Sequence, residues 1–184
     1  MKKSTTIGLV IALSLIISAC SNNTQKEVFK DFEFEKDFET NKTLFSKDTF
    51  TINGHSTEGG EIFVFQSKKR DYKVYDVWLY NEMSKRNTIY FVDKSNNVKL
   101  VKQTTYIYDK PIYLEGATAK KLVQYFTYHE DNFKYFSNLK LEITDVNLKI
   151  KKRKELEQLF NATLQSTNNS LIKKDKNYIM GNQY

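Results

Sequence analysis

The fold is restricted most strongly by a series of short runs, between residues 49 and 108, in which β-branched and aromatic residues recur. Residues of these types favour extended strands, and short polar segments separate the runs. In the runs 72–80 and 98–108, apolar and aromatic side chains often return at every second position, which is the period of a strand. The predicted strands are Thr49–Ile52, Glu61–Gln66, Tyr72–Tyr80, Thr88–Val92 and Val98–Tyr108.

The connections between these runs predict how the strands pair. Residues 68–71, 81–87 and 93–97 are polar, and each segment is short enough to form a hairpin. Strands joined by hairpins pair antiparallel and lie beside each other in chain order. We therefore expect an antiparallel meander.

The pattern changes after Pro111, where apolar residues recur at intervals of three and four, as on one side of a helix. These residues predict one or two helices there: Leu122, Tyr125, Phe126, His129, Phe133 and Phe136. Residues 139–143 alternate as a strand, and Lys151–Gln165 is predicted to be the last helix. Its apolar stripe comprises Leu156, Leu159, Phe160, Thr163 and Leu164, and the polar residues from Ser166 onward are expected to fray.

Residues 31–39 fit two structures. Their phenylalanines alternate with charged residues, which suits a strand with one buried face. The spacing from Phe34 to Phe38 equally suits a helix. The sequence does not decide between the two.

The first 20 residues have the three parts of an export signal. Lys2 and Lys3 precede an apolar stretch from Ile7 to Ala19, and Cys20 follows it. A helix of about 13 residues spans only about 20 Å, which is short of the roughly 30 Å hydrocarbon core of a membrane. We therefore expect a leader that directs export and is then removed.

The end of this leader predicts a lipid anchor. Ile17, Ser18 and Ala19 immediately precede Cys20 and match the lipobox of bacterial lipoproteins, in which small residues give the signal peptidase access to the bond before the cysteine. The thiol of Cys20 would then carry a diacylglyceryl group. Two acyl chains bury many methylenes at about 0.8 kcal/mol each, so the attachment is stable. The expected location is the outer face of the cell membrane.

These elements together predict an α+β fold in which an antiparallel β-meander sheet is covered on one face by helices, including a C-terminal helix. The expected organisation begins with a signal peptide at residues 1–19 and a lipidated N terminus with a flexible tether at 20–31. A single domain at 32–165 and a polar tail at 166–184 follow.

Composition limits the classes of partner and the means of stabilisation. Cys20 is the only cysteine, so no disulfide can form within the chain and packing must hold the fold. Without Lys2 and Lys3, the chain has 27 basic and 22 acidic groups. An exported protein meets anionic lipids and wall polymers, so this modest basic excess does not indicate nucleic acid. The abundance of Lys and Asn indicates a Gram-positive source of low GC content.

The sequence contains no set of residues typical of catalysis. Lipidation uses the lone thiol, and the only histidines are His55 and His129. His129 falls on the apolar side of a predicted helix, as a core histidine would, and His55 lies in the loop-like stretch 53–60. Clustered zinc ligands, a calcium loop and a Gly-rich phosphate loop are missing from the sequence. We therefore expect no enzymatic activity, metal or cofactor.

Two features are candidates for binding. One is a basic run that opens the last predicted helix, where positive charges oppose the helix macrodipole: Lys149, Lys151, Lys152, Arg153 and Lys154. This run either contacts an anionic surface, such as lipid headgroups, teichoic acid or DNA, or is simply a solvated face. The other is a set of tyrosines that either line a partner surface or are half-buried strand residues: Tyr72, Tyr75, Tyr80, Tyr106, Tyr108 and Tyr113.

The last eight residues of the leader, Ala12 to Ala19, resemble the apolar peptides that are cut from lipoprotein leaders and act as enterococcal sex pheromones. Those peptides have the same position, immediately before the lipidated cysteine. With a small domain rich in Lys and Tyr behind this leader, the chain resembles the transfer-region lipoproteins of staphylococcal conjugative plasmids, of the TraH or TrsH type.

This resemblance implies an accessory component of a conjugative transfer system, similar to type IV secretion, on the surface of the donor cell. The conjugation machinery proteins would then be partners, and the released leader peptide would act as a separate signal. The competing hypothesis is a ligand-binding or exclusion lipoprotein that protects its host cell against a phage or a second plasmid. Such a protein would have the same anchor and a similar size.

Overall fold

The computed structural model describes residues 31–129, 132–137 and 141–181. The predicted signal peptide, the lipobox with Cys20, and the tether up to residue 30 lie outside the described residues. The chain separates into two compact units, one ending at Thr40 and the other beginning at Asn41. In the first unit, residues 31–40 are helical, which resolves the two alternatives for this stretch in favour of the helix.

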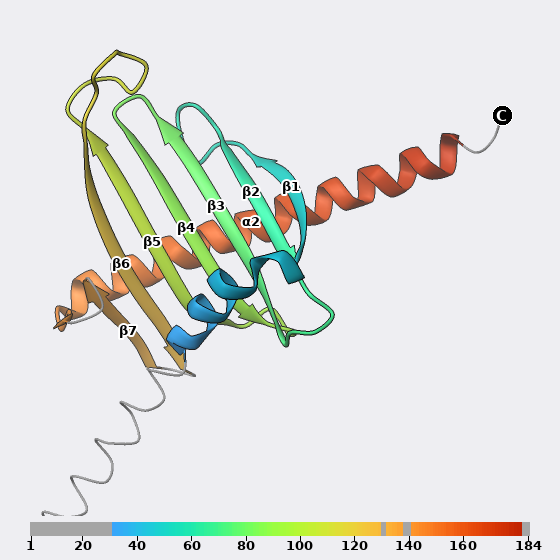
Figure 1. Ribbon diagram of the computed structural model, residues 1–184, viewed down its shortest axis with the longest axis horizontal. Coiled ribbons are helices and arrows are strands. Elements are labelled where there is room, and N and C mark those ends of the chain that lie inside the picture. Colours follow the sequence, from blue (N-terminus) through green and yellow to red (C-terminus); the bar gives the residue numbers. More distant parts are fainter. Residues whose placement is uncertain (1–30, 130–131, 138–140, 182–184) are drawn as a thin grey trace, which may run out of the picture. The chain divides into compact units, whose positions relative to one another are not determined.

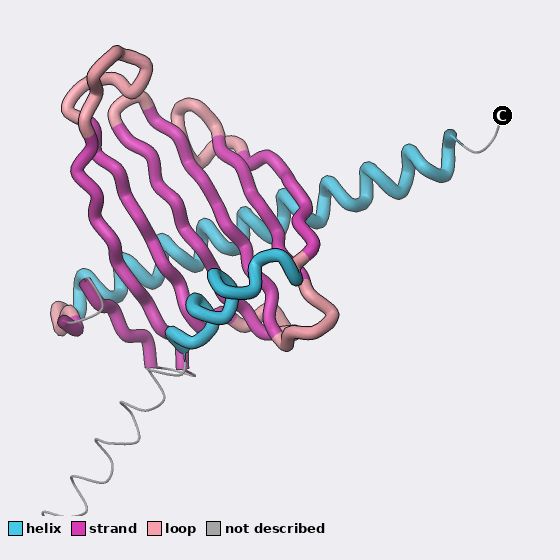
Figure 2. The backbone as a smooth tube through the Cα atoms, viewed as in Figure 1, coloured by secondary structure: helices cyan, strands magenta, loops and turns pink. Residues whose placement is uncertain are grey.

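Within the described residues, the second unit contains an eight-stranded sheet in which the strands lie in chain order and every neighbouring pair is antiparallel (Figures 1 and 2). The strands are β1 (Ser46–Ile52), β2 (Gly60–Gln66), β3 (Tyr72–Asn81), β4 (Ser84–Asp93), β5 (Val98–Tyr108), β6 (Ala119–His129), β7 (Asn132–Ser137) and β8 (Leu141–Glu142). A short 3-10 helix, η1 (Lys42–Leu44), precedes β1, and a long helix, α2 (Val146–Gly181), follows β8. The prediction of an α+β fold with an antiparallel meander and a C-terminal helix is confirmed.

All five strands predicted between residues 49 and 108 are present, and four of them are longer than predicted. The largest extension is in β4, which begins at Ser84 and not at Thr88. Its polar first residues pair with the end of β3 because the two strands are joined by a two-residue turn between Asn81 and Ser84. The predicted strand at 139–143 is reduced to Leu141–Glu142 in the described residues.

The helix predicted after Pro111 is wrong, because residues 122–129 belong to β6 and residues 132–136 to β7, and the register of this antiparallel pair sets His129 opposite Asn132. β6 is buried on both faces over residues 124–127, so its apolar side chains do not alternate with polar ones. A strand of this kind imitates the three- and four-residue spacing of a helix. Its aromatic and β-branched residues nevertheless favour the extended form.

Helix α2 crosses one face of the sheet from β7 to β1, and its C-terminal part continues beyond β1 (Figure 1). It is longer than the predicted Lys151–Gln165 at both ends. At its start, the Asp145 carboxylate accepts a hydrogen bond from the backbone N–H of Leu148 at 3.0 Å, which caps the helix.

The predicted fraying from Ser166 onward is also wrong, because the helix runs to Gly181. The hydroxyls of Thr163, Thr167 and Ser170 donate to backbone carbonyls three or four residues earlier, at 2.8–3.0 Å. These bonds satisfy the polar side chains within the helix, so a polar sequence can continue it. None of the described helices combines the length and the apolar character that crossing a membrane needs.

The core lies between α2 and the sheet face that it covers, which we call the α2 face. Leu156, Leu159 and Phe160 of the helix are buried against the strands. The Phe160 ring lies 4.9 Å from the Tyr90 ring and 5.6 Å from the Tyr75 ring, and the Tyr90 hydroxyl donates to the backbone carbonyl of Leu156 at 3.0 Å. Alternate residues of the same strands point to the opposite face of the sheet.

Candidate binding surface

The predicted basic run lies in the first turns of α2, and acidic groups neutralise much of it. The ammonium of Lys149 lies 3.2 Å from Glu142, that of Lys152 lies 3.1 Å from Glu155, and the guanidinium of Arg153 lies 2.7 Å from Glu157. Lys151 and Lys154 remain exposed.

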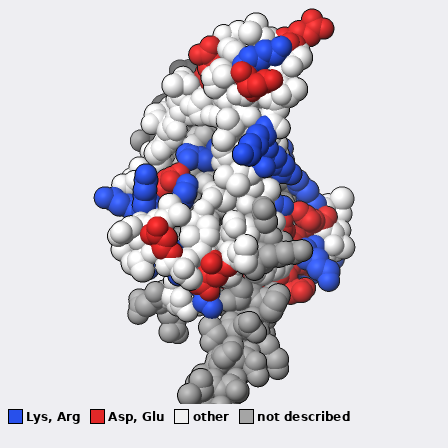
Figure 3. All heavy atoms as spheres, turned by 90° about the vertical axis from the view of Figure 1, so that its left-hand side faces the viewer, with Lys and Arg blue, Asp and Glu red and all other residues white. Residues whose placement is uncertain are grey.

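Basic and acidic side chains also lie next to each other on the face of the molecule that Figure 3 shows. Because three basic residues of the run at 149–154 have acidic partners, the run is a mixed-charge surface of the helix. The prediction that it contacts an anionic surface stays a prediction, and its local partners reduce the charge that it offers.

The two histidines lie far apart in the fold. His55 is exposed in the loop between β1 and β2, as expected for a hairpin tip. His129 is half-buried at the end of β6 and not on a helix, so its predicted position is corrected. The strand registers place these residues at opposite ends of the sheet. In the part of the chain that is described, no group of three or more His, Cys, Asp or Glu side chains is arranged to hold a metal ion.

The predicted tyrosines separate into two groups. Tyr75 is buried under α2 and Tyr72 is buried against Phe45 and Phe91, so both are core residues. Tyr80, Tyr106 and Tyr108 are half-buried on the sheet, and Tyr113 is exposed in the loop after β5.

Two of these tyrosines belong to one line of side chains that crosses four strands. Tyr80 of β3 is paired with Lys85 of β4, Lys85 with Tyr106 of β5, and Tyr106 with Lys121 of β6. Paired residues point to the same face, and these four alternate with residues of the α2 face such as Leu79. We call them the Tyr–Lys row. It lies on the face opposite α2 and is roughly 14 Å long, because neighbouring strands are about 4.8 Å apart.

Cation–π contacts join the members of the Tyr–Lys row. The Lys85 ammonium lies 4.9 Å from the centre of the Tyr106 ring, and the Lys121 ammonium lies 6.0 Å from the same ring. Lys85 also lies 5.7 Å from the Trp78 ring, which stacks on Tyr80 with a centroid distance of 6.4 Å. The rings therefore hold both lysine head groups near the surface of the sheet.

Two carboxylates limit the row on the β2 and β3 side. The Tyr80 hydroxyl donates to Glu61 at 3.1 Å, and burial together with this carboxylate raises the pKa of Tyr80. Asp76 accepts a hydrogen bond from the Asn87 amide, and burial raises the pKa of Asp76 above its ordinary value. The positive end of the row is therefore its β4–β6 half, around Lys85, Tyr106 and Lys121.

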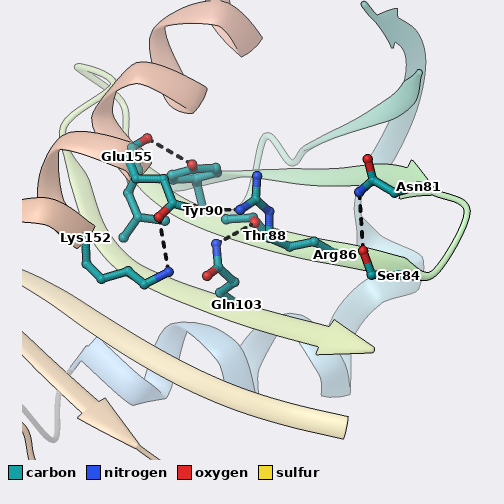
Figure 4. A network of polar contacts seen from close by, with 9 residues as sticks. Asn81, Ser84, Arg86, Thr88, Tyr90, Gln103, Lys152 and Glu155 are labelled. Atoms are coloured by element: carbon teal, nitrogen blue, oxygen red, sulfur yellow. Dashed lines mark hydrogen bonds and ion pairs between the residues drawn. The ribbon is translucent and has the colours of Figure 1, made fainter. Parts of the chain in front are cut away.

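A separate polar network on the α2 face fixes the helix to the sheet (Figure 4). The Arg86 guanidinium of β4 lies 2.6 Å from Glu155 of α2, which also accepts from Lys152. Behind this pair, the Gln103 amide donates to the Thr88 hydroxyl at 3.2 Å. These groups bond to one another, so the network has a structural role in docking α2.

The sequence alone did not single out Lys85, Lys121 or Trp78. One sequence feature predicts the pairing of Tyr80 with Lys85. It is the two-residue hairpin turn between Asn81 and Ser84, which sets these two residues opposite each other. No protein-family model matches the chain, and no curated protein or solved structure is significantly similar to it.

Proposed function

We propose that the chain is a bacterial surface lipoprotein whose domain is a non-enzymatic binding module. The observation that carries the proposal is the placement of the only cysteine, Cys20, directly behind Ile17, Ser18 and Ala19 at the end of an apolar leader. Lipid on Cys20 would hold the domain on the outer face of the membrane. The Tyr–Lys row supports a binding role, because it places two lysines and an aromatic ring together on the sheet.

Cell fractionation tests the anchor. Cys20→Ala removes the thiol that takes the diacylglyceryl group, so we expect the variant to appear uncleaved or shed into the medium. Ser21→Ala is the matched control, since it changes the next residue and leaves the thiol in place. Cys20→Ala protein that still incorporates a fatty-acid label would overturn the proposal.

We further propose that this lipoprotein is an accessory component of a conjugative transfer system. The support for this role is the resemblance of residues 12–19 to pheromone peptides cut from lipoprotein leaders. Deletion of the gene from its element should lower the transfer frequency in matings on a solid surface, and the wild-type gene supplied in trans should restore it. Unchanged transfer would favour a ligand-binding or exclusion lipoprotein instead.

A further inference from the structure

We infer that the β4–β6 half of the Tyr–Lys row binds a phosphodiester polymer of the bacterial envelope, such as a poly(glycerol phosphate) teichoic acid. The inference rests on the proposed function, because only an exported chain meets such a polymer. It assigns the partner of the domain by chemical class.

The geometry of Lys85 and Lys121 calls for an anion. Both ammonium groups lie within 6.0 Å of the single ring of Tyr106, although the lysines come from strands on either side of it. Neither lysine forms an ion pair with a carboxylate among the described residues. The two lysines therefore offer positive charge that no ion-paired carboxylate in the described part of the chain offsets, at two neighbouring points around one ring. Successive phosphates of a polymer can bind at these two points.

Two further lysines on the same face lie over aromatic rings, and the Asp76 carboxylate partly offsets the charge of Lys47. Lys47 lies 3.8 Å from the Phe63 ring, and Lys102 lies 6.0 Å from the Tyr125 ring. Lysines held over rings have lost part of their freedom before binding, which lowers the entropy cost of ordering them on a ligand. These lysines lie on different strands, so an extended polyanion can contact more of them at once than a single headgroup can.

The rings themselves argue against nucleic acid. Proteins that bind single strands stack bases on accessible aromatic faces. Here two ammonium groups lie near the Tyr106 ring, and the Trp78 ring lies against Tyr80 on one side and near Lys85 as well. These rings support the lysines, so the ligand is recognised by its phosphates and not by flat bases.

The test uses the mature lipidated protein, purified from membranes in detergent, and a lipid-free poly(glycerol phosphate) teichoic acid in a direct binding assay. The variant Lys85→Gln/Lys121→Gln should bind at least about tenfold more weakly and show a flatter dependence of affinity on salt. The matched control is Lys68→Gln/Lys69→Gln, which removes the same charge from the exposed β2–β3 turn at the other end of the strands. This control should bind within about twofold of the wild type.

A third variant, Tyr106→Leu, keeps both lysines and removes the ring that positions them. Tyr106→Leu should bind the polymer more weakly than Lys68→Gln/Lys69→Gln and more strongly than Lys85→Gln/Lys121→Gln. The melting temperature of every variant is measured to show that each is folded. Equal loss in the two double variants would overturn the inference in favour of general charge attraction.

Two further probes distinguish other occupants. Tighter binding to a 20-nucleotide oligothymidine than to the teichoic acid would overturn the inference in favour of nucleic acid. Binding only to vesicles of phosphatidylglycerol and phosphatidylcholine would overturn it in favour of lipid headgroups. No binding of the wild type to any probe would also overturn it, but would leave the lipid anchor intact, because fractionation of Cys20→Ala tests that anchor separately.

Discussion

The side chain of Glu155 joins α2 to the sheet, since it accepts from Arg86 of β4 and from Lys152 one turn away. The Arg86 and Glu155 side chains are only 30% and 32% exposed, so solvent screens this pair less than an ordinary surface pair. Glu155→Ala should therefore lower the free energy of unfolding by about 1–2 kcal/mol, measured by urea denaturation.

The control for this prediction lies two residues further along the same helix. Glu157 pairs with Arg153, but both side chains are more exposed, at 48% and 42%. Glu157→Ala should cost less than about 0.5 kcal/mol. Equal effects of the two substitutions would show that the Arg86 contact does not help to dock α2.

The raised pKa of Asp76 predicts that the stability of the protein depends on pH. Burial raises its pKa in the folded protein above the ordinary value of 3.8, so its ionised form destabilises the native state at neutral pH. This penalty disappears as the pH falls through the raised pKa and below 3.8. Asp76→Asn keeps an oxygen that can accept from Asn87 and removes the charge. The variant should have a higher melting temperature than the wild type at pH 7 and nearly the same one at pH 3; a lower melting temperature at pH 7 would contradict this account.

At the scale of elements, the docking of α2 depends on a narrow apolar stripe. Leu156 is 1% exposed and belongs to the core cluster with Tyr90 and Val101. Leu156→Ala should lower the free energy of unfolding by about 2–5 kcal/mol, because it leaves a cavity under the helix. Gln158→Ala, on the exposed side of the same turn, should leave stability within about 0.5 kcal/mol. A small effect of Leu156→Ala would mean that the helix is not held by this stripe.

The elements that could be predicted from the sequence are those in which apolar residues recur at a regular spacing or a recognisable turn marks the end. β3 and β5 alternate, and the segments beside them are short and polar, so the meander followed directly. β6 was missed because it is buried on both faces, which hides the two-residue period. The length of α2 was missed because hydroxyls that bond within the helix, such as that of Thr163, resemble turn residues in a sequence.

The Tyr–Lys row shows why a site on a sheet is harder to predict than the sheet itself. Tyr80 and Tyr106 were candidates by residue type, but their contact with Lys85 and Lys121 depends on the register of three strand pairs. A slip of one residue in any pair would move a side chain to the other face. The irregular register between Phe91 and Val92 shows that this alignment cannot be counted from the turns alone.

At the scale of the whole molecule, the proposed anchor and the proposed binding surface would act together. A lipid on Cys20 would confine the domain to the membrane surface, where envelope polymers are concentrated. Weak contacts through Lys85 and Lys121 would then be sufficient, because tethering raises the effective concentration of the partner. The proposed binding surface would therefore depend on the proposed anchor for its biological use, although the two can be measured separately.

The most direct measurement of the central claim is the intact mass of the native protein purified from membranes of the organism that makes it. The account predicts a chain that begins at Cys20 and carries the added mass of a diacylglyceryl group, with residues 1–19 removed. The Cys20→Ala variant, purified from the membranes or from the medium, should lack that added mass. A wild-type protein with an unmodified Cys20, or with the leader still attached, would contradict the account.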